Sequence, residues 1–368
     1  MSRFSSRWGV WGLLWCFSGL LVVATPPLAS QVVVGQVVEA TTGVPVGEGF
    51  VVLLDEQGRE VARALSGADG RFVLFAPGPG SFRLRSERIG YSAVVSPPLA
   101  LERDQRLVHQ LAIAAVGVEL APVVVTGRSR CRSRPDREEG TAAVWDEVRK
   151  ALAAATWIES NRQYQYRAVK HHREWDRTGR LLLREASDTT VGMGRTAFRS
   201  VPAAQLATRG YIVREQDSTA YYGPDATVLQ DSTFLARHCF WVVRRRFEGA
   251  QQIGLSFEPE PGSQLADVSG VLWVDEGSAQ LRKLEYRYTH VPDRVNDHRI
   301  GGTVEFLRLP SGAWIVHRWR IRMPRVAFQT FHPPIGHPET RTVLHGFQDR
   351  GGEVLEIRAA DGRIVYPR

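Results

Sequence analysis

The segment His171-His172-Arg173-Glu174 contains a His-x-x-Glu pair, the spacing with which zinc peptidases hold their metal. Such sites add a distant His and leave one position open for the water that attacks the substrate. Apolar and polar residues alternate through positions 164–170, so this segment is predicted to be a β-strand. Side chains three residues apart on a strand point to opposite faces. His171 and Glu174 are therefore not expected to share one metal ion.

Two more histidines, His332 and His337, lie in a Pro-rich segment that is followed by His345, with Glu339 as the nearby carboxylate. A surface loop is the expectation for this segment. Gly-x-Ser-x-Gly, the phosphate loop GxxxxGK[ST] and GxGxxG are all missing from the sequence. We predict a protein without catalytic residues, cofactor or bound metal, although a catalytic site assembled from separate strands would leave no local pattern.

The N-terminus has the layout of a secretory signal peptide. Arg3 and Arg7 precede an uncharged, mostly apolar run over residues 8–24, and small residues follow at Ala29 and Ser30. Residues 1–30 are therefore predicted to direct export across the inner membrane, to the periplasm or the outer membrane. The apolar run is long enough for an uncleaved membrane anchor to be the alternative.

Cysteine usage fits export. The chain has three cysteines, and Cys16 lies inside the predicted signal. An even pair, Cys131 and Cys239, remains, and such a pair in an exported protein is typical of a disulfide. We predict that these two residues are bonded to each other.

The charge of the chain is moderately positive, at +8, and it is spread along the sequence. No nucleic-acid partner is expected, and contact with a membrane would be peripheral at most. The run of residues 244–246 and the alternating Arg318, Arg320 and Arg322 could meet phosphate headgroups. The alternative for these arginines is an ordinary solvated face.

Residues 31–113 read as short strands separated by turns. Asp69-Gly70 can form a tight turn with positive φ, and residues 77–80, Pro-Gly-Pro-Gly, force a reversal. In the strand between them Phe72 and Leu74 share a face. Strands of this length at such regular spacing predict an all-β sandwich.

This stretch resembles the carboxypeptidase regulatory-like, or transthyretin-like, domain. The residues that carry the resemblance are Gly35, Gly43 with Pro45, Asp69 to Phe72, Pro79-Gly80 before Phe82, and Gly90-Tyr91. The resemblance implies a seven-stranded Ig-like sandwich that serves as an accessory module and carries no catalytic residues. It brings no peptidase with it.

Residues 114–140 are predicted to be a linker. Within them, Val123 to Thr126 resembles the segment that follows such sandwiches in TonB-dependent outer-membrane receptors. The chain that remains is far too short for the 22-stranded barrel of those transporters. The resemblance therefore implies only a periplasmic or outer-membrane setting.

Residues 141–368 are predicted to form one helix and a curved antiparallel sheet. Val144, Val148 and Leu152 recur at helical spacing, so a helix is expected to run from Thr141 to Ala155. The strand period of two then returns repeatedly, including a hairpin with its turn at residues 176–179. A long antiparallel sheet with one apolar face curls. The fold class expected for the whole chain is all-β with one helix.

The stretch from Gly270 to Tyr288 resembles the paired strands of the half-barrel in periplasmic lipoprotein carriers such as LolA, which hold acyl chains. That resemblance implies an aromatic-lined cavity; the alternative is that these side chains form an ordinary core. The candidate lining residues are Trp241, Phe257, Trp273, Tyr286, Tyr288, Phe306 and Trp319.

We therefore expect an exported, non-catalytic binding or adaptor protein of the cell envelope, with a protein of the envelope as its partner. The first alternative is a periplasmic carrier that holds a lipid or lipidated ligand in the second domain. The second alternative is carbohydrate binding through the sandwich, so the ligand classes left open are hydrophobic molecules and glycans.

Overall fold

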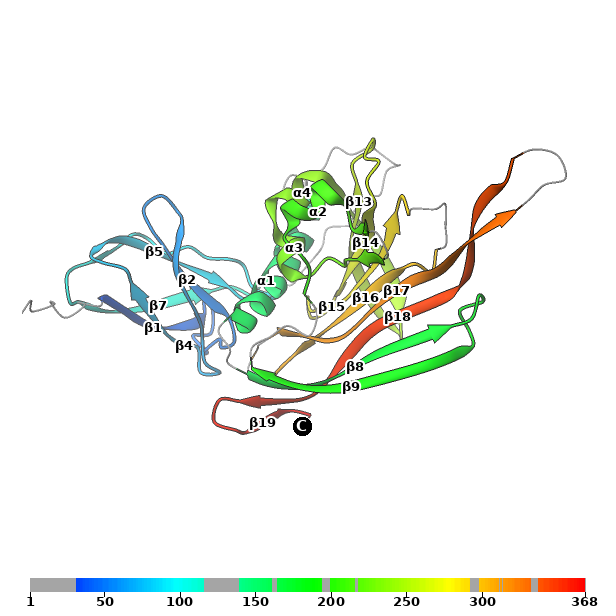
Figure 1. Ribbon diagram of the computed structural model, residues 1–368. Coiled ribbons are helices and arrows are strands. Elements are labelled where there is room, and N and C mark those ends of the chain that lie inside the picture. Colours follow the sequence, from blue (N-terminus) through cyan, green and yellow to red (C-terminus); the bar gives the residue numbers. More distant parts are fainter. Residues whose placement is uncertain are drawn as a thin grey trace, which may run out of the picture.

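A computed structural model of the protein describes residues 31–115, 139–160, 164–193, 199–215, 218–291, 298–310, 312, 314–331 and 337–367. The described chain is mostly β-structure. It forms a small sandwich and a much larger curved antiparallel sheet with helices on one side (Figure 1). Within these ranges no helix combines the length and apolarity that crossing a bilayer requires.

The sandwich contains seven strands in two sheets, as expected for residues 31–113. One sheet has the order β4-β1-β7 and the other β3-β2-β5-β6. β1 and β7 pair in parallel, while the other neighbours are antiparallel. The strands are β1 (Gln31–Glu39), β2 (Phe50–Leu54), β3 (Glu60–Leu65), β4 (Arg71–Ala76), β5 (Gly80–Glu87), β6 (Leu99–Leu101) and β7 (Arg106–Ile113).

β4 shows why these residues form a sandwich. Phe72 and Leu74 are buried between the sheets, while Val73 and Phe75 point to solvent. The strand enters from Gly70, which has φ +76°. A Cβ at this glycine would lie 2.5 Å from the carbonyl oxygen of Val37, so the turn requires glycine.

The larger sheet is formed by ten of the described strands in the order β12-β13-β14-β15-β16-β17-β18-β8-β9, with β19 pairing on β18. Every neighbouring pair in it is antiparallel. The strands are β8 (Tyr164–Trp175), β9 (Leu182–Met193), β12 (His238–Phe247), β13 (Ala250–Pro259), β14 (Asp267–Asp275), β15 (Leu281–Thr289), β16 (Gly301–Arg308), β17 (Trp314–Phe331), β18 (Glu339–Ala359) and β19 (Ile364–Tyr366). A separate hairpin is made by β10 (Ile212–Glu215) and β11 (Ser218–Tyr221).

The predicted helix is present as α1 (Glu139–Ser160) and is longer than expected. Val144, Val148 and Leu152 lie in the core that α1 shares with the sheet. The expectation of a single helix was wrong. Three short helices precede β12: α2 (Ala203–Arg209), α3 (Ala226–Gln230) and α4 (Ser232–Arg237).

These helices escaped the sequence analysis because a helix of one or two turns repeats its apolar face too few times to show a period. Their start signals are visible in retrospect. The carboxylate of Asp225 accepts a hydrogen bond from the Val228 amide, and that of Asp231 accepts one from the Thr233 amide. Both are N-caps, which satisfy amides that the first helical turn leaves free.

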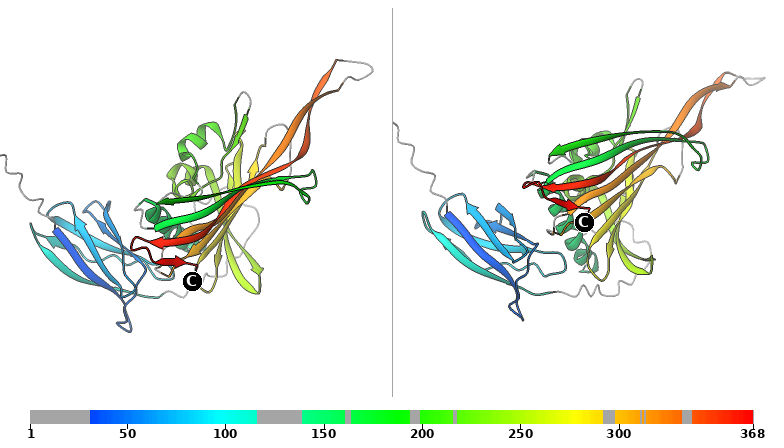
Figure 2. Two further views of the ribbon diagram at one scale, coloured as in Figure 1. Left: turned by 60° about the horizontal axis from the view of Figure 1, so that its bottom comes forward. Right: turned by 90° about the horizontal axis from the view of Figure 1, so that it is seen from below.

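β2 is buried on both faces, and this joins the sandwich to α1. Val51 and Leu53 lie in the core of the sandwich. Phe50, Val52 and Leu54 belong instead to the core that contains α1 and the large sheet. Figures 1 and 2 show the same arrangement, with α1 lying at the junction of the two parts.

Cys239 is disulfide-bonded. Its partner lies outside the described residues, as do Cys16 and Cys131. The pairing of Cys239 with Cys131 therefore stays a prediction.

Candidate functional site

The His-x-x-Glu pair lies on β8, and the prediction that this segment is a strand is confirmed. His171 pairs with Gly351 and Glu174 with Gln348, three positions apart on the neighbouring strand, so the two side chains face opposite sides. Glu174 instead forms an ion pair with Arg325 at 2.8 Å. In the part of the chain that the structure describes, no three His, Cys, Asp or Glu side chains gather where they could hold an ion. His332 lies outside that part.

The two faces of the large sheet differ in chemistry. One face packs on α1 and is apolar; its central row runs across the strands through Leu255, Leu272, Leu284, Val304 and Trp319. We call the opposite face the open face. Alternation along the strands places Ser256, Val271, Glu285, Thr303 and Arg320 there.

The open face carries a hollow of about 550 Å³ that extends from β12 to β17. This volume lies in the range of small-ligand sites. Trp241 and Val271 contribute apolar surface, and Ser256, Thr303, Arg287 and Arg320 contribute polar groups.

Strand register positions the arginines. Arg287 on β15 and Arg322 on β17 both pair with Gly301 on the strand between them. In the next row Glu285 and Arg320 both pair with Thr303. Gly301 has no side chain, and a Cβ there would clash with the carbonyl oxygen of Tyr286, so β15 and β16 approach closely between the two arginines.

Two further charged groups near this space, Arg322 and Glu285, are held by protein partners, and the exposed Glu258 of β13 also lines the hollow. Arg322 donates two hydrogen bonds of 2.7 Å, one to each carboxylate oxygen of Asp349. The carboxylate of Glu285 accepts from the indole of Trp273 at 2.9 Å and from Arg245 at 3.0 Å.

Glu285 is ionised in this setting. Burial works against its charge, but hydrogen bonds from Lys283 and Trp273 and the charge of Arg245 outweigh it and hold the pKa of Glu285 below its usual value. Neither Glu285 nor Asp349 therefore remains available to neutralise the other arginines of the hollow.

Arg287 and Arg320 differ from these residues. Both are exposed to solvent, and among the described residues no carboxylate lies within ion-pair distance of either. They lie two strands apart and two residues apart along the strand direction, which corresponds to about 12 Å. Two guanidinium groups with free donors thus face the same hollow.

The seven aromatic side chains predicted as ligand-lining are divided by the structure. Trp241, Phe257 and Tyr286 line the hollow. Trp319 borders a second hollow beside β8 and β9, of about 460 Å³. Neither hollow is lined by the other three side chains, Trp273, Tyr288 and Phe306. All of the seven aromatic side chains except Trp241 are buried. The six buried rings serve mainly as core, which is the alternative considered from the sequence.

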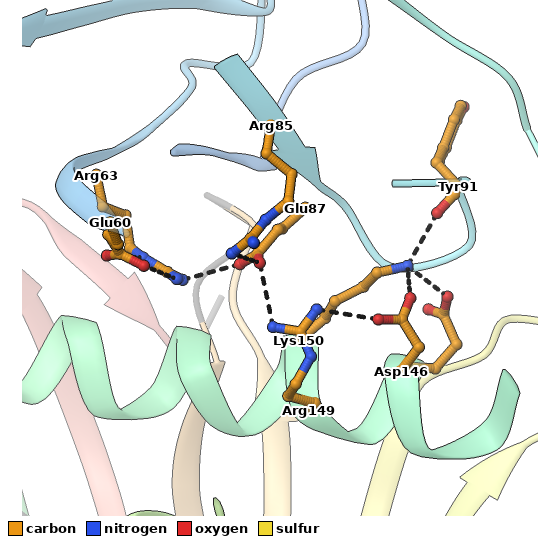
Figure 3. Close-up of polar contacts among 9 residues, drawn as sticks. Glu60, Arg63, Arg85, Glu87, Tyr91, Asp146, Arg149 and Lys150 are labelled. Carbon is orange, nitrogen blue, oxygen red and sulfur yellow. Dashed lines mark hydrogen bonds and ion pairs between the residues drawn. The ribbon is translucent and has the colours of Figure 1, made fainter. Parts of the chain in front are cut away.

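A second polar cluster lies where the sandwich meets α1 (Figure 3). Glu87 at the end of β5 is 1% exposed and is surrounded by arginines. Its carboxylate lies 2.7 Å from Arg85, 3.0 Å from Arg63 and 3.1 Å from Arg149 of α1. Glu87 of the sandwich and Arg149 of α1 therefore form an ion pair across the buried junction of the two parts.

Lys150 of α1 extends this cluster. Its ammonium group lies 2.7 Å from both Asp146 and Glu147 and donates a hydrogen bond to the carbonyl oxygen of Tyr91 at 2.9 Å. Glu147 in turn accepts from the Gly90 amide at 2.8 Å. The Gly90-Tyr91 step of the sandwich is thus held by α1. We interpret the cluster as an interface, since its charges are satisfied by one another.

In the comparisons with known proteins, a family model matches only the N-terminal part of the chain. The family DUF1416, described as a protein of unknown function, matches residues 19–113. No curated protein matches the chain.

Two solved structures are similar at low scores. A DUF1329 family protein from Desulfovibrio piger has 10% identity and a TM-score of 0.26, with 59% of this chain and 95% of that chain covered. A protein described as membrane-associated and of unknown function from Bacteroides fragilis has 9% identity and a TM-score of 0.17, with 88% and 97% covered. Likeness at these scores carries no functional argument.

The ion pairs of Glu87 at the junction between the sandwich and α1 predict that the stability of the protein depends on pH. Burial opposes ionisation of Glu87, but the charges of Arg63, Arg149 and Arg85 outweigh it, so the pKa of Glu87 is lowered from 4.5. A carboxylate with a lowered folded-state pKa contributes stability that is fully present above the unfolded value and is lost as the pH falls through the folded value.

We expect the melting-temperature difference between the wild type and Glu87→Gln to be constant near neutral pH and to shrink below about pH 4.5. Thermal unfolding over a pH series measures it. Burial raises the pKa of Glu147, so its contribution to stability changes with pH in the opposite direction. Glu147 is present in both proteins, so this contribution largely cancels in the difference between their melting temperatures. A difference that stays constant into strong acid would show that Glu87 is not paired as described.

Proposed function

We propose that the protein is a non-catalytic binding protein of the cell envelope that holds an anionic group of its partner in the hollow on the open face. The observation that carries the proposal is the pair Arg287 and Arg320, two exposed guanidinium groups without an acidic partner among the described residues, on one hollow. Proteins normally pair neighbouring arginines with carboxylates, as this chain does for Arg322 with Asp349.

The surroundings define the ligand class. Guanidinium groups recognise carboxylate and phosphate oxygens with two parallel hydrogen bonds. The hydroxyl group of Thr303 adds a donor, while Trp241 and Val271 add an apolar surface. The hollow therefore suits a carboxylate or phosphate group attached to an apolar or ring-shaped body.

The sandwich supports an adaptor role. We propose that it is a carboxypeptidase regulatory-like domain, because it has the seven strands in two sheets and the Gly70 turn that such a domain requires. Export remains part of the proposal, on the basis of residues 1–30. In this arrangement the sandwich is fixed to α1, and α1 supports the sheet that carries the hollow.

Citrate and pyrophosphate are suitable probes, because they supply the two kinds of anion. At constant ionic strength, we expect either or both to raise the melting temperature of the wild type, by on the order of 5 °C at about one hundred times the dissociation constant. The double variant Arg287→Ala/Arg320→Ala is expected to lose this increase. Thermal unfolding with and without each probe is the measurement.

A matched control removes two exposed arginines that do not line the hollow, Arg180 in the turn between β8 and β9 and Arg246 on β12. Arg180→Ala/Arg246→Ala has the same change in net charge and should keep the full response. An equal loss in both double variants would point to a general charge effect and contradict the proposal. So would a wild type that responds to neither anion.

A further inference from the structure

β9 is an edge strand of the large sheet and is paired on one side only. It follows β8 in the strand order, and no described strand lies beyond it (Figures 1 and 2). From Arg184 to Met193 it pairs with β8 without interruption. The other side of its backbone therefore presents a row of N–H and C=O groups that can pair with another strand.

Its side chains are open to solvent on both faces. Every residue from Leu182 to Thr189 is exposed. Neither a helix nor a loop of the described chain covers this edge, and β9 contains no proline, the residue that blocks strand addition.

The sequence of β9 is self-complementary in the antiparallel direction. When two copies pair with Ala186 opposite Ala186, Arg184 of each copy lies opposite Asp188 of the other. The two-fold axis produces this oppositely charged pair twice. Glu185 then faces Ser187, Leu183 faces Thr189 and Leu182 faces Thr190, so no like charges meet.

On β8, Glu174 lies opposite Arg184 and Lys170 lies opposite Asp188. Within the described chain, neither of these two β9 side chains takes part in an ion pair, whereas Glu185 between them is bound to Arg173 at 2.8 Å. Residues directly opposite in an antiparallel pair lie about 5 Å apart, so an Arg–Asp pair is within reach.

Neighbouring registers are worse. Moving the centre toward the N-terminus places Glu185 opposite Glu185, and moving it toward the C-terminus places Arg184 opposite Thr190. Like charges directly opposite each other destabilise a strand pair. The register centred on Ala186 is the one that matches both charges.

The ends of the strand add apolar contact. In the same register, Leu181 lies near Val191 of the other copy, and these two side chains are 61% and 63% exposed in the single chain. The pairing of β9 with β8 shifts by one residue at Leu183, so the fit is regular from Arg184 onward and approximate before it.

The other edge of the sheet does not share this property. β12 carries Arg244, Arg245 and Arg246, and self-pairing centred on Arg245 would place arginines opposite arginines. On β9, by contrast, the register centred on Ala186 brings opposite charges together.

We propose that the protein forms a two-fold symmetric dimer through antiparallel pairing of β9 with β9, centred on Ala186. The two large sheets then continue into each other across the axis. This inference is independent of the proposed anion site, which lies between β12 and β17.

Charge-reversal variants of Arg184 and Asp188 in the full mature chain test the proposed dimer. Sedimentation velocity is expected to show a dimer for the wild type. Arg184→Asp and Asp188→Arg should each raise the dimer dissociation constant on the order of tenfold or more, because each places like charges opposite each other twice. An equal mixture of the two variants should dimerise again, because the opposite charges then meet across the strands.

Two further proteins complete the experiment. Arg184→Asp/Asp188→Arg restores the match within one chain and should dimerise like the wild type. Arg246→Asp on β12 is the matched control and should leave the dimer unchanged. A monomeric wild type overturns the proposal, and so do single variants that dimerise fully or a mixture that does not recover. Circular dichroism confirms that each variant is folded.

Discussion

Replacing Glu87 with Gln is expected to lower the free energy of unfolding by about 3–5 kcal/mol, the usual cost of removing one partner from a buried ion pair. Glu87 is 1% exposed, and the guanidinium groups of Arg63, Arg85 and Arg149 lie within 3.1 Å of its oxygens. Glutamine keeps the shape of the side chain and removes its charge, so three cations lose their common anion. Urea denaturation of the wild type and the variant measures the difference.

The control for this prediction is an exposed ion pair of the same sandwich. Arg71 lies 3.5 Å from Asp69, and both side chains are open to solvent. Arg71→Gln is expected to change the free energy of unfolding by about 1 kcal/mol or less, because solvent screens exposed pairs. Similar values for the two variants would show that the cluster around Glu87 does not stabilise the interface.

Phe50→Ala is the second large prediction, with an expected loss of about 3–5 kcal/mol in the free energy of unfolding. Phe50 is 4% exposed, and its ring lies 5.2 Å from that of Trp157 in an edge-to-face arrangement. Removing it leaves a cavity between β2 and α1 and costs the aromatic contact as well. Urea denaturation with fluorescence detection of tryptophan measures the loss.

Phe75→Ala provides the matched control, because it removes the same side chain from another strand of the sandwich. Phe75 is 61% exposed on β4, so its replacement should cost about 1 kcal/mol or less. If Phe50→Ala were equally mild, the shared core between the sandwich and α1 would not contribute to stability as the structure indicates.

These two predictions concern the same interface, and they bear on the proposed function. The proposed adaptor role requires the sandwich to be held in a fixed position relative to the hollow. Apolar contact through Phe50 and the ionic cluster around Glu87 both join the sandwich to α1. A variant that weakens the interface should therefore retain the response to citrate or pyrophosphate while losing stability.

The local structure of this protein could be predicted from the sequence because it depends on neighbouring residues. Alternation of Phe72 and Leu74 with exposed residues gives β4, and the helical spacing of Val144 and Val148 gives α1. The turn at Gly70 follows from the conformational freedom of glycine. The short helices α2 to α4 were missed, since their length is too small to produce a periodic pattern.

The sites were decided by the tertiary structure alone. In the sequence, Arg318, Arg320 and Arg322 are equivalent members of one alternating row, yet Arg322 is paired with Asp349 while Arg320 faces the hollow. Nothing local distinguishes them, because the partner of each side chain is set by the register between strands far apart in the chain. The same holds for Glu87 and Arg149. Their attraction depends on the distance between them and on their burial. Both are properties of the folded molecule, and neither can be read from the separation of the two residues in the sequence.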